Sequence, residues 1–500
     1  MSTTTLRAQI EALNLEISAH KQRLITLTAS RDALDAELRR VAVFPIDTLP
    51  SELLSEIFVC CMPGEPAVAT CESMPLPLTR VCKLWAQTAM GTPALWRSLH
   101  LAVDDKARYD EQMVGLATTW LQNCKGRLSL GLAVGNFNRA NAPSQLSDVS
   151  SLIAANGANL SSFNLSFNPE SDVPLLLAEQ SFLFDNLEEL GMRSVQYAPR
   201  DTAADRENIA GLVRAFAAMP ALQKVRIRYL PPTWLPLPWS QITEFECIMY
   251  TGAQVLQALR LLPNLVVFTI ELVYNAGAED RSTLSVVTHR KLRHMSIQEG
   301  GGRQPILGIL YMLNFLTLPR LETLRPDAVQ EETFSAFIHR SEYPPLKVLD
   351  FRPVDDEQDG YLCVNDLAKI FSRFDHLYKL RIGQSLGTHD LVDTLASTFT
   401  SFPGCLPRLQ ELEIDGFSAG TGDAGLDDLI WMLEQHRKYS RELRRANVRL
   451  NAHLPGVATT WRTIVAPSKH RDVLNQWKAD GLEVFIWHRQ EPAWRLDSVV

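Results

Sequence analysis

The feature that most constrains the fold of this chain is a short apolar pattern that recurs along most of its 500 residues. The pattern is [LIW]-x-x-[LFM]-x-[LIMFC], and it returns every 20 to 35 residues or so, which indicates a repeated unit of structure. Segments with helical spacing of apolar residues separate the copies. The copies, of which those at Leu321 and Leu443 are weaker, start at Trp96, Leu160, Leu187, Leu222, Ile242, Leu265, Leu292, Leu321, Leu346, Leu377, Leu409 and Leu443.

Each copy predicts a short strand whose first, fourth and sixth residues point inward, as with Leu222, Val225 and Ile227. The amphipathic segments between the copies predict helices at 207–218, 253–262, 366–374 and 426–438. Strand and helix alternating at this period resemble a leucine-rich repeat solenoid over about residues 96 to 450. The resemblance implies an irregular, loop-rich α/β horseshoe. The alternative is an α/β domain with a single parallel sheet, which shares the same alternation.

The end of the chain continues this alternation. Residues 471–487 predict one more helix and a strand at Leu482–Trp487. A repeat array needs a terminal unit that covers its last core residues, so residues 471–500 are expected to form a C-terminal cap. The repeat-like region as a whole is assigned to residues 102–500.

Strand geometry also predicts a binding surface. In the pattern, the residue between the last two apolar positions points away from the core, onto the other sheet face. We interpret this row as the site of a target protein, and the alternative is a merely solvated face. Changing Arg226 and Arg381 to Glu should then weaken recognition of the target protein without affecting the melting temperature. The predicted target-binding residues are Arg226, Thr269, Ser296, Asp350, Arg381 and Glu413.

A second constraint lies upstream, in the apolar stretch 44–101. Its first half, FPIDTLPSELLSEIF, predicts a short helix that starts after Pro50 and Ser51 and has one wholly apolar face. Its second half places Leu78, Val81, Cys82, Trp85 and Ala89 on one helical stripe, which Pro93 must end. A helical core this small cannot bury so many large apolar side chains. Some of them should therefore contact another protein.

These residues resemble an F-box. The strings are L-P-x-E-L-L-x-x-I-F at 49–58, V-C-K-x-W at 81–85 and P-x-L-W at 93–96, although residues 59–77 form a longer connection than usual. The resemblance implies a three-helix module that docks on the Skp-family adaptor of an SCF-type ubiquitin ligase. The alternative is an ordinary helical hairpin packed on the rest of the chain. The implied adaptor-binding residues are Leu49, Pro50, Leu53, Leu54, Ile57, Phe58, Leu78, Val81, Cys82, Trp85, Leu95 and Trp96.

Residues 1–43 predict one long helix with a heptad seam. No Gly or Pro occurs from Leu6 to Phe44, and apolar residues alternate at spacings of three and four, interrupted by His20 and Arg31. A lone helix cannot bury such a seam. It predicts either a coiled coil with a second chain or a helix that folds back on its own chain. The seam residues are Leu6, Ile10, Leu13, Ile17, Leu24, Leu27, Leu34, Leu38 and Val41.

Composition and motifs narrow the function further. The net charge of -8 gives no electrostatic reason to bind nucleic acid or an anionic membrane. The eight cysteines form no C-x-x-C pair, and no secretory or membrane-spanning segment is recognised, which favours the cytoplasm or nucleus. Gly420, Gly422 and Gly425 match G-x-G-x-x-G, but five residues separate the first glycine from the preceding strand, which disfavours a dinucleotide site.

The sequence therefore predicts a non-catalytic substrate-recognition subunit of an SCF-type ubiquitin ligase, without a cofactor or metal. One alternative is an interaction scaffold that belongs to no ligase, and the last is an α/β enzyme that uses the Gly420 loop.

Overall fold

A computed structural model provides the structure of the chain. The description begins at Thr3 and ends at Arg489, with internal gaps. The described residues are 3–41, 49–63, 70, 72–103, 110–137, 144–196, 202–216, 219–273, 284–300, 312–326, 331–351, 364–383, 391–417, 424–440, 442–451, 461–463 and 468–489.

The chain forms two compact units. Unit 1 comprises Met1–Gly64 and Glu72–Leu95, and unit 2 comprises Glu65–Cys71 and Trp96–Val500. The expected boundary between the F-box-like module and the repeats lay at residue 101, but the first sheet strand, β1 (Ser98–Val103), already belongs to unit 2. The pattern copy that starts at Trp96 is thus part of the sheet.

Unit 1 is helical. Its elements are α1 (Thr3–Val41), α2 (Ser51–Cys60), η2 (Leu76–Arg80) and α3 (Lys83–Gly91), and η3 (Pro93–Trp96) leads into unit 2. The helix predicted to run from Leu78 to Ala89 is interrupted. Cys82 adopts an extended conformation, and its sulfur accepts the Trp85 backbone N–H as the N-cap of α3. Helix α3 ends at Gly91, before Pro93, as predicted.

Helix α1 confirms the predicted long helix in residues 1–43. The apolar seam along it is exposed: Ile10, Leu13, Ile17, Leu24, Leu27 and Leu34 each keep between 49% and 70% of their surface accessible. Within the described residues this helix therefore leaves its apolar stripe open to solvent. Packing of the stripe would have to come from contacts that the described part of the chain does not make.

Unit 2 is built on one large sheet that is not closed into a barrel. Its 15 strands follow one another almost in chain order, and all are parallel except the last, β16, which pairs antiparallel with β17. In sheet order the strands are β1, β2 (Leu128–Val134), β3 (Leu160–Phe167), β4 (Glu189–Ser194), β5 (Lys224–Arg228), β6 (Glu244–Tyr250), β7 (Val267–Val273), β9 (His294–Gly300), β11 (Thr323–Pro326), β12 (Val348–Phe351), β13 (Lys379–Gly383), β14 (Glu411–Phe417), β15 (Arg445–Asn451), β17 (Glu483–Arg489) and β16 (Trp461–Thr463).

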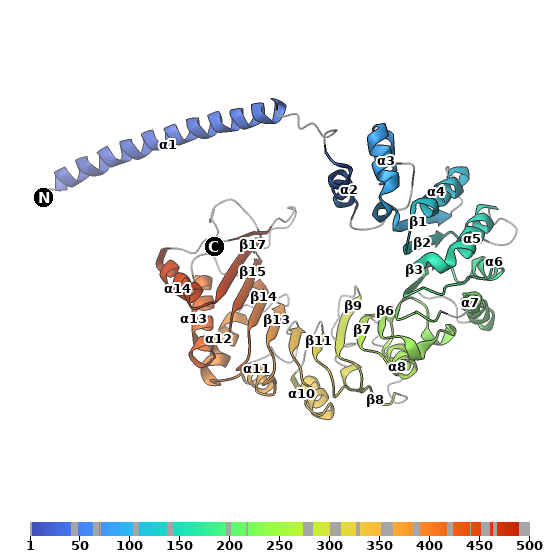
Figure 1. Ribbon diagram of the computed structural model, residues 1–500. Coiled ribbons are helices and arrows are strands. Elements are labelled where there is room, and N and C mark those ends of the chain that lie inside the picture. The colour runs from blue at the N-terminus through green and yellow to red at the C-terminus, as the bar shows by residue number, and fades with distance from the viewer. Residues whose placement is uncertain are drawn as a thin grey trace. The chain divides into compact units, whose positions relative to one another are not determined.

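The helices of unit 2 form a second layer on one side of this sheet (Figure 1). Successive helices pack against one another, as α6 does on α7 and α12 on α13. The predicted helices agree with α7, α8, α11 and α13 to within a few residues. The helices are α4 (Asp110–Asn123), α5 (Ser144–Asn156), α6 (Val173–Ala178), α7 (Ala203–Ala215), α8 (Gly252–Leu261), α10 (Glu331–Arg340), α11 (Val364–Phe371), α12 (Leu391–Ser401), α13 (Ala424–Tyr439) and α14 (Ser468–Ala479).

The core of unit 2 lies between the sheet and these helices. Leu222, Val225 and Ile227 are fully buried, as are Leu377, Leu380 and Ile382. The prediction that the first, fourth and sixth residues of each copy point inward is therefore confirmed for these strands. Because nearly every strand repeats that choice, the side chains between the inward positions emerge on the second face of the sheet.

Candidate functional site

Two surfaces carry the residues singled out from the sequence, one in each unit. On unit 1, apart from the stripe of α1, the exposed apolar residues lie mainly on α2. Leu53 and Ile57 are spaced by one helical turn and keep 53% and 41% of their surfaces accessible, and Val59 follows at 37%. Val81, before α3, keeps 58%. Large apolar side chains so exposed on a short helix are candidates for contact with another protein.

The twelve implied adaptor-binding residues separate into three groups by burial. Leu54, Phe58, Leu78, Leu95 and Trp96 are buried, so they contribute to the interior and are not available for docking. Leu49 and Trp85 are half-buried. The exposed residues are Pro50, Leu53, Ile57, Val81 and Cys82.

The interior of unit 1 explains this separation. The rings of Phe58 on α2 and Trp85 on α3 lie 5.0 Å apart, which joins the two helices. Leu54 and Phe58 occupy one side of α2, and Leu53 and Ile57 the adjacent side. Spacing alone predicts one broad apolar face on α2 and cannot tell which side of that face is buried.

On unit 2, the six predicted target-binding residues lie in register on the sheet face opposite the helices. Arg226 pairs with Glu246, Glu246 with Thr269, and Thr269 with Ser296. Farther along, Asp350 pairs with Arg381, and Arg381 pairs with Glu413. All six are half-buried by their neighbours in the row. The same rule, applied to the other copies, adds His100, Asn164, Gly191, Glu246, Arg325 and Asn447 to the row.

Apart from Arg325, the charged members of this row form ion pairs in two clusters. In the first, on β4 to β6, Arg226 lies 2.7 Å from Glu246 and 3.8 Å from Glu189. In the second, on β12 to β14, Arg381 lies 3.5 Å from Asp350 and 3.8 Å from Glu413. Between the clusters the row carries the uncharged Thr269 and Ser296 and, opposite Ser296, the exposed Arg325.

Lys379 belongs to the second cluster and contacts both of its glutamates. Its ammonium lies 2.8 Å from Glu413 and 3.0 Å from Glu411. Burial disfavours the charged form of this lysine, but hydrogen bonds to the two carboxylates outweigh it, so the pKa of Lys379 is raised above its ordinary value. Lys379 therefore stays ionised at neutral pH.

These ion pairs correct one expectation. The sequence predicted that Arg226→Glu and Arg381→Glu would leave the melting temperature unchanged. In the folded chain, a glutamate at 226 would face Glu246 and Glu189, and one at 381 would face Asp350 and Glu413. Like charges directly opposite on neighbouring strands are destabilising, so both reversals should lower the melting temperature. Thr269 and Ser296 are better positions for probing this surface.

A hollow at the β1 to β6 end of the same face was not predicted. It involves His100, Asn164 and Gly191 together with Arg193, Arg226 and Arg228. Arg193 and Arg228 stand two residues beyond the row, where the alternation of the strands returns side chains to the same face. Extending the six-residue pattern by one position would have identified them.

The described residues contain neither a metal-type cluster of side chains nor a membrane-spanning helix. Among them, no three His, Cys, Asp or Glu side chains are grouped as a metal ion would require. Within the same residues, no helix combines the length and the apolar character needed to span a bilayer. Most of the glycine-rich motif, residues 418–423, lies outside the described residues.

Comparison with known proteins adds no family assignment, because the chain matches no protein-family model and no curated protein.

Proposed function

We propose that this chain is a substrate-recognition subunit of an SCF-type ubiquitin ligase. Unit 1 binds the Skp-family adaptor, unit 2 binds the target protein, and the ubiquitin chemistry takes place on other subunits. The observation that carries the proposal is the exposed apolar pair Leu53 and Ile57 on α2, within the L-P-x-E-L-L-x-x-I-F string. Such a pair is costly to leave in water and is typical of a docking surface.

Unit 2 is proposed to be an irregular leucine-rich-repeat-like solenoid. Three features support this: the apolar pattern at nearly every strand, the strand order that follows the chain, and helices confined to one side of the sheet. A doubly wound α/β sheet instead reverses its strand order and carries helices on both faces. In a solenoid, the helix-free face is the usual surface for binding partners.

The second candidate is an interaction scaffold outside any ligase. The mutually neutralised charges of unit 2 favour it as much as they favour a ligase subunit, since a polar face serves any protein partner. Adaptor binding separates the two candidates.

The deciding experiment is co-elution of the purified chain with the Skp-family adaptor in size-exclusion chromatography. We expect a stable complex. Separate elution at micromolar concentrations, with unit 1 folded by circular dichroism, would contradict the ligase role and favour the scaffold.

The target surface is tested at Thr269 and Ser296, between the two clusters. Changing both together to Tyr places two large uncharged side chains on the face without breaking an ion pair of either cluster and without adding a charge opposite Arg325. We expect weaker capture of the target, measured as slower turnover of ubiquitinated proteins that the wild-type chain recruits, with adaptor binding unchanged. Equal turnover in the variant would place the target site elsewhere.

Helix α1 is proposed to self-associate through its exposed stripe. A peptide covering residues 3–41 should gain helical circular dichroism signal as its concentration rises, because an isolated helix is marginal in water and association buries the stripe. Ile17→Lys and Leu24→Lys together should abolish that concentration dependence. A wild-type peptide whose signal stays low and constant with concentration would rule out self-association.

A further inference from the structure

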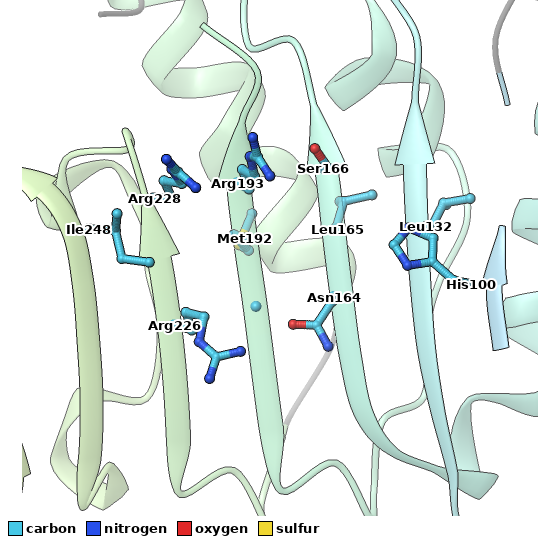
Figure 2. Close-up of a pocket in the computed structure, with 11 residues that line it drawn as sticks. His100, Leu132, Asn164, Leu165, Ser166, Met192, Arg193, Arg226, Arg228 and Ile248 are labelled. Carbon is cyan, nitrogen blue, oxygen red and sulfur yellow. The ribbon is translucent and has the colours of Figure 1, made fainter. Parts of the chain in front are cut away.

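The hollow at the β1 to β6 end of the sheet face is lined by both apolar and polar side chains, and three of the polar ones are arginines. Its volume is about 230 Å³, and all of its lining residues belong to unit 2. Figure 2 shows Arg193 and Arg228 side by side at one end, beside Ser166, with Arg226 and Asn164 toward the other. Pockets for drug-sized ligands start at about 300 Å³, so this one suits a small anion or a single side chain.

Glycines shape the floor of the hollow. Gly191 pairs with Asn164, and a Cβ atom at Gly191 would lie 2.0 Å from the Asn164 side-chain oxygen. Gly131 pairs with His100 in the same way, and a Cβ there would lie 2.9 Å from the ring Nδ1 of His100. The side chains of Asn164 and His100 can therefore lie over the next strand only because glycine occupies it. Their polar atoms line a surface that any larger residue would fill.

The charge in the hollow is not neutralised evenly. Arg226 is held by Glu246 and Glu189, as described above. Arg193 and Arg228 lie directly opposite each other on β4 and β5, and among the described residues neither forms an ion pair. Two like charges in such a pair oppose each other, and no described carboxylate compensates them.

Arg228 has hydrogen-bonding capacity left over. Its Nη2 atom lies 3.3 Å from the Tyr229 hydroxyl, and its guanidinium carbon lies 5.0 Å above the Tyr229 ring. Its Nε atom is buried and has no hydrogen-bond partner in the described part of the chain. A buried donor without a partner is costly, and a shift of the Arg228 side chain toward a bound anion would let the anion accept this hydrogen bond and remove the cost.

We propose that Arg193 and Arg228 bind an oxyanion, a phosphate or carboxylate group, in this hollow. Two guanidinium forks side by side match the several oxygens of such a group, and a dianion would neutralise both. Ser166, next to Arg193 in the register, offers one more donor. The oxyanion comes either from a free small anion or from an acidic side chain of a bound polypeptide. The site involves unit 2 alone, so it stands independently of the proposed ligase role.

The test is isothermal titration calorimetry of the full chain with inorganic phosphate and, separately, with a glutamate homopeptide, at constant ionic strength. A glutamine homopeptide is the uncharged control. We expect saturable binding of at least one anionic probe. Arg193→Gln and Arg228→Gln should each weaken it about tenfold or more, because each removes charged hydrogen bonds. Arg320→Gln, which removes an exposed arginine outside the hollow, should not change it.

The two probes separate the two sources. Binding of phosphate with the expected losses supports a free anion, and binding of the glutamate peptide alone supports a polypeptide ligand. Arg193 is exposed, so its replacement should leave the melting temperature unchanged, and Arg193→Lys should bind more weakly than wild type because it keeps the charge but loses the fork. No saturable binding of either anion, or equal binding by wild type and both Gln variants, would overturn the proposal.

Discussion

An aspartate in place of Ile57 or Leu53 is expected to abolish adaptor binding while both units stay folded. Each native side chain is substantially exposed in the free chain, so a charge there stays in water and costs the fold little. In a complex the same charge would be buried against the adaptor without a partner. The loss of such an apolar contact typically costs about 2 kcal/mol or more, a decrease in affinity of about thirtyfold or more.

Two matched substitutions separate docking from folding. Leu183 on unit 2 is 57% exposed, so Leu183→Asp carries the same chemical change at an unrelated surface and should leave adaptor affinity unchanged. Leu54, next to Leu53 on α2, is fully buried, so Leu54→Asp should instead unfold unit 1. Affinities are measured by surface plasmon resonance, and folding by circular dichroism. If Leu53→Asp and Ile57→Asp bind the adaptor as tightly as wild type does, the docking assignment is wrong.

The strands of unit 2 were predictable because burial imposes the same three apolar positions on almost every repeat. Helix α8 shows why the helices were nearly as predictable from the sequence. Apolar spacing predicted 253–262, and the structure places the helix at Gly252–Leu261. Its start is fixed by Thr251 and Gln254, whose side chains cap each other's backbone N–H groups.

Strand β2 shows where the pattern fails. Arg127 stands where the pattern requires its first apolar residue, and its side chain reaches Glu188, just before β4, instead of the core. Strand β2 alternates inward and outward from Leu128 onward, and the extra residue at the register shift, between Leu160 and Ser162, lies on β3. The pattern requires a step of three residues between its first two apolar positions, so it could not describe a strand that alternates from its first residue.

Spacing along the sequence also could not show which charged residues of the exposed face lie opposite a partner of opposite charge. It placed Arg226 on the target surface and omitted Arg193 and Arg228, although all three lie on the same face. What distinguishes them is the neighbouring strand: Glu246 is opposite Arg226, whereas Arg228 is opposite Arg193. Pairing between strands that are distant in sequence is set by register, which one strand's own pattern does not contain.

Stability is expected to fall below neutral pH because of a buried histidine on α13. His436 is 3% exposed, and its ring packs edge-on against Phe399 of α12 with centroids 4.9 Å apart. Burial lowers the pKa of His436 to about 4. The nearby backbone of Leu406 opposes this shift, although it forms no hydrogen bond with either ring nitrogen.

The sign follows from proton binding in the two states. Between pH 4 and 6.5 the unfolded chain protonates this histidine and the folded chain does not. Unfolding therefore takes up a proton, and the free energy of unfolding falls as pH decreases through this window. The stability contributed is fully present above pH 6.5. It is reduced by about 2 kcal/mol at pH 5 and by about 3 kcal/mol once the pH reaches 4, at 1.36 kcal/mol per pKa unit.

Urea unfolding of the wild type and of His436→Leu at pH 7 and pH 5 measures this contribution. Leucine keeps the contact with Phe399 and cannot take up a proton in either state, so the loss of stability on acidification should shrink by about 2 kcal/mol relative to wild type. His376→Leu, at an exposed histidine before β13, should behave like wild type. Burial also lowers the pKa values of His100 and His289, so the variant keeps a smaller dependence of the same sign. An unchanged difference between the two pH values in His436→Leu would mean that His436 is protonated as readily in the folded chain as in the unfolded one.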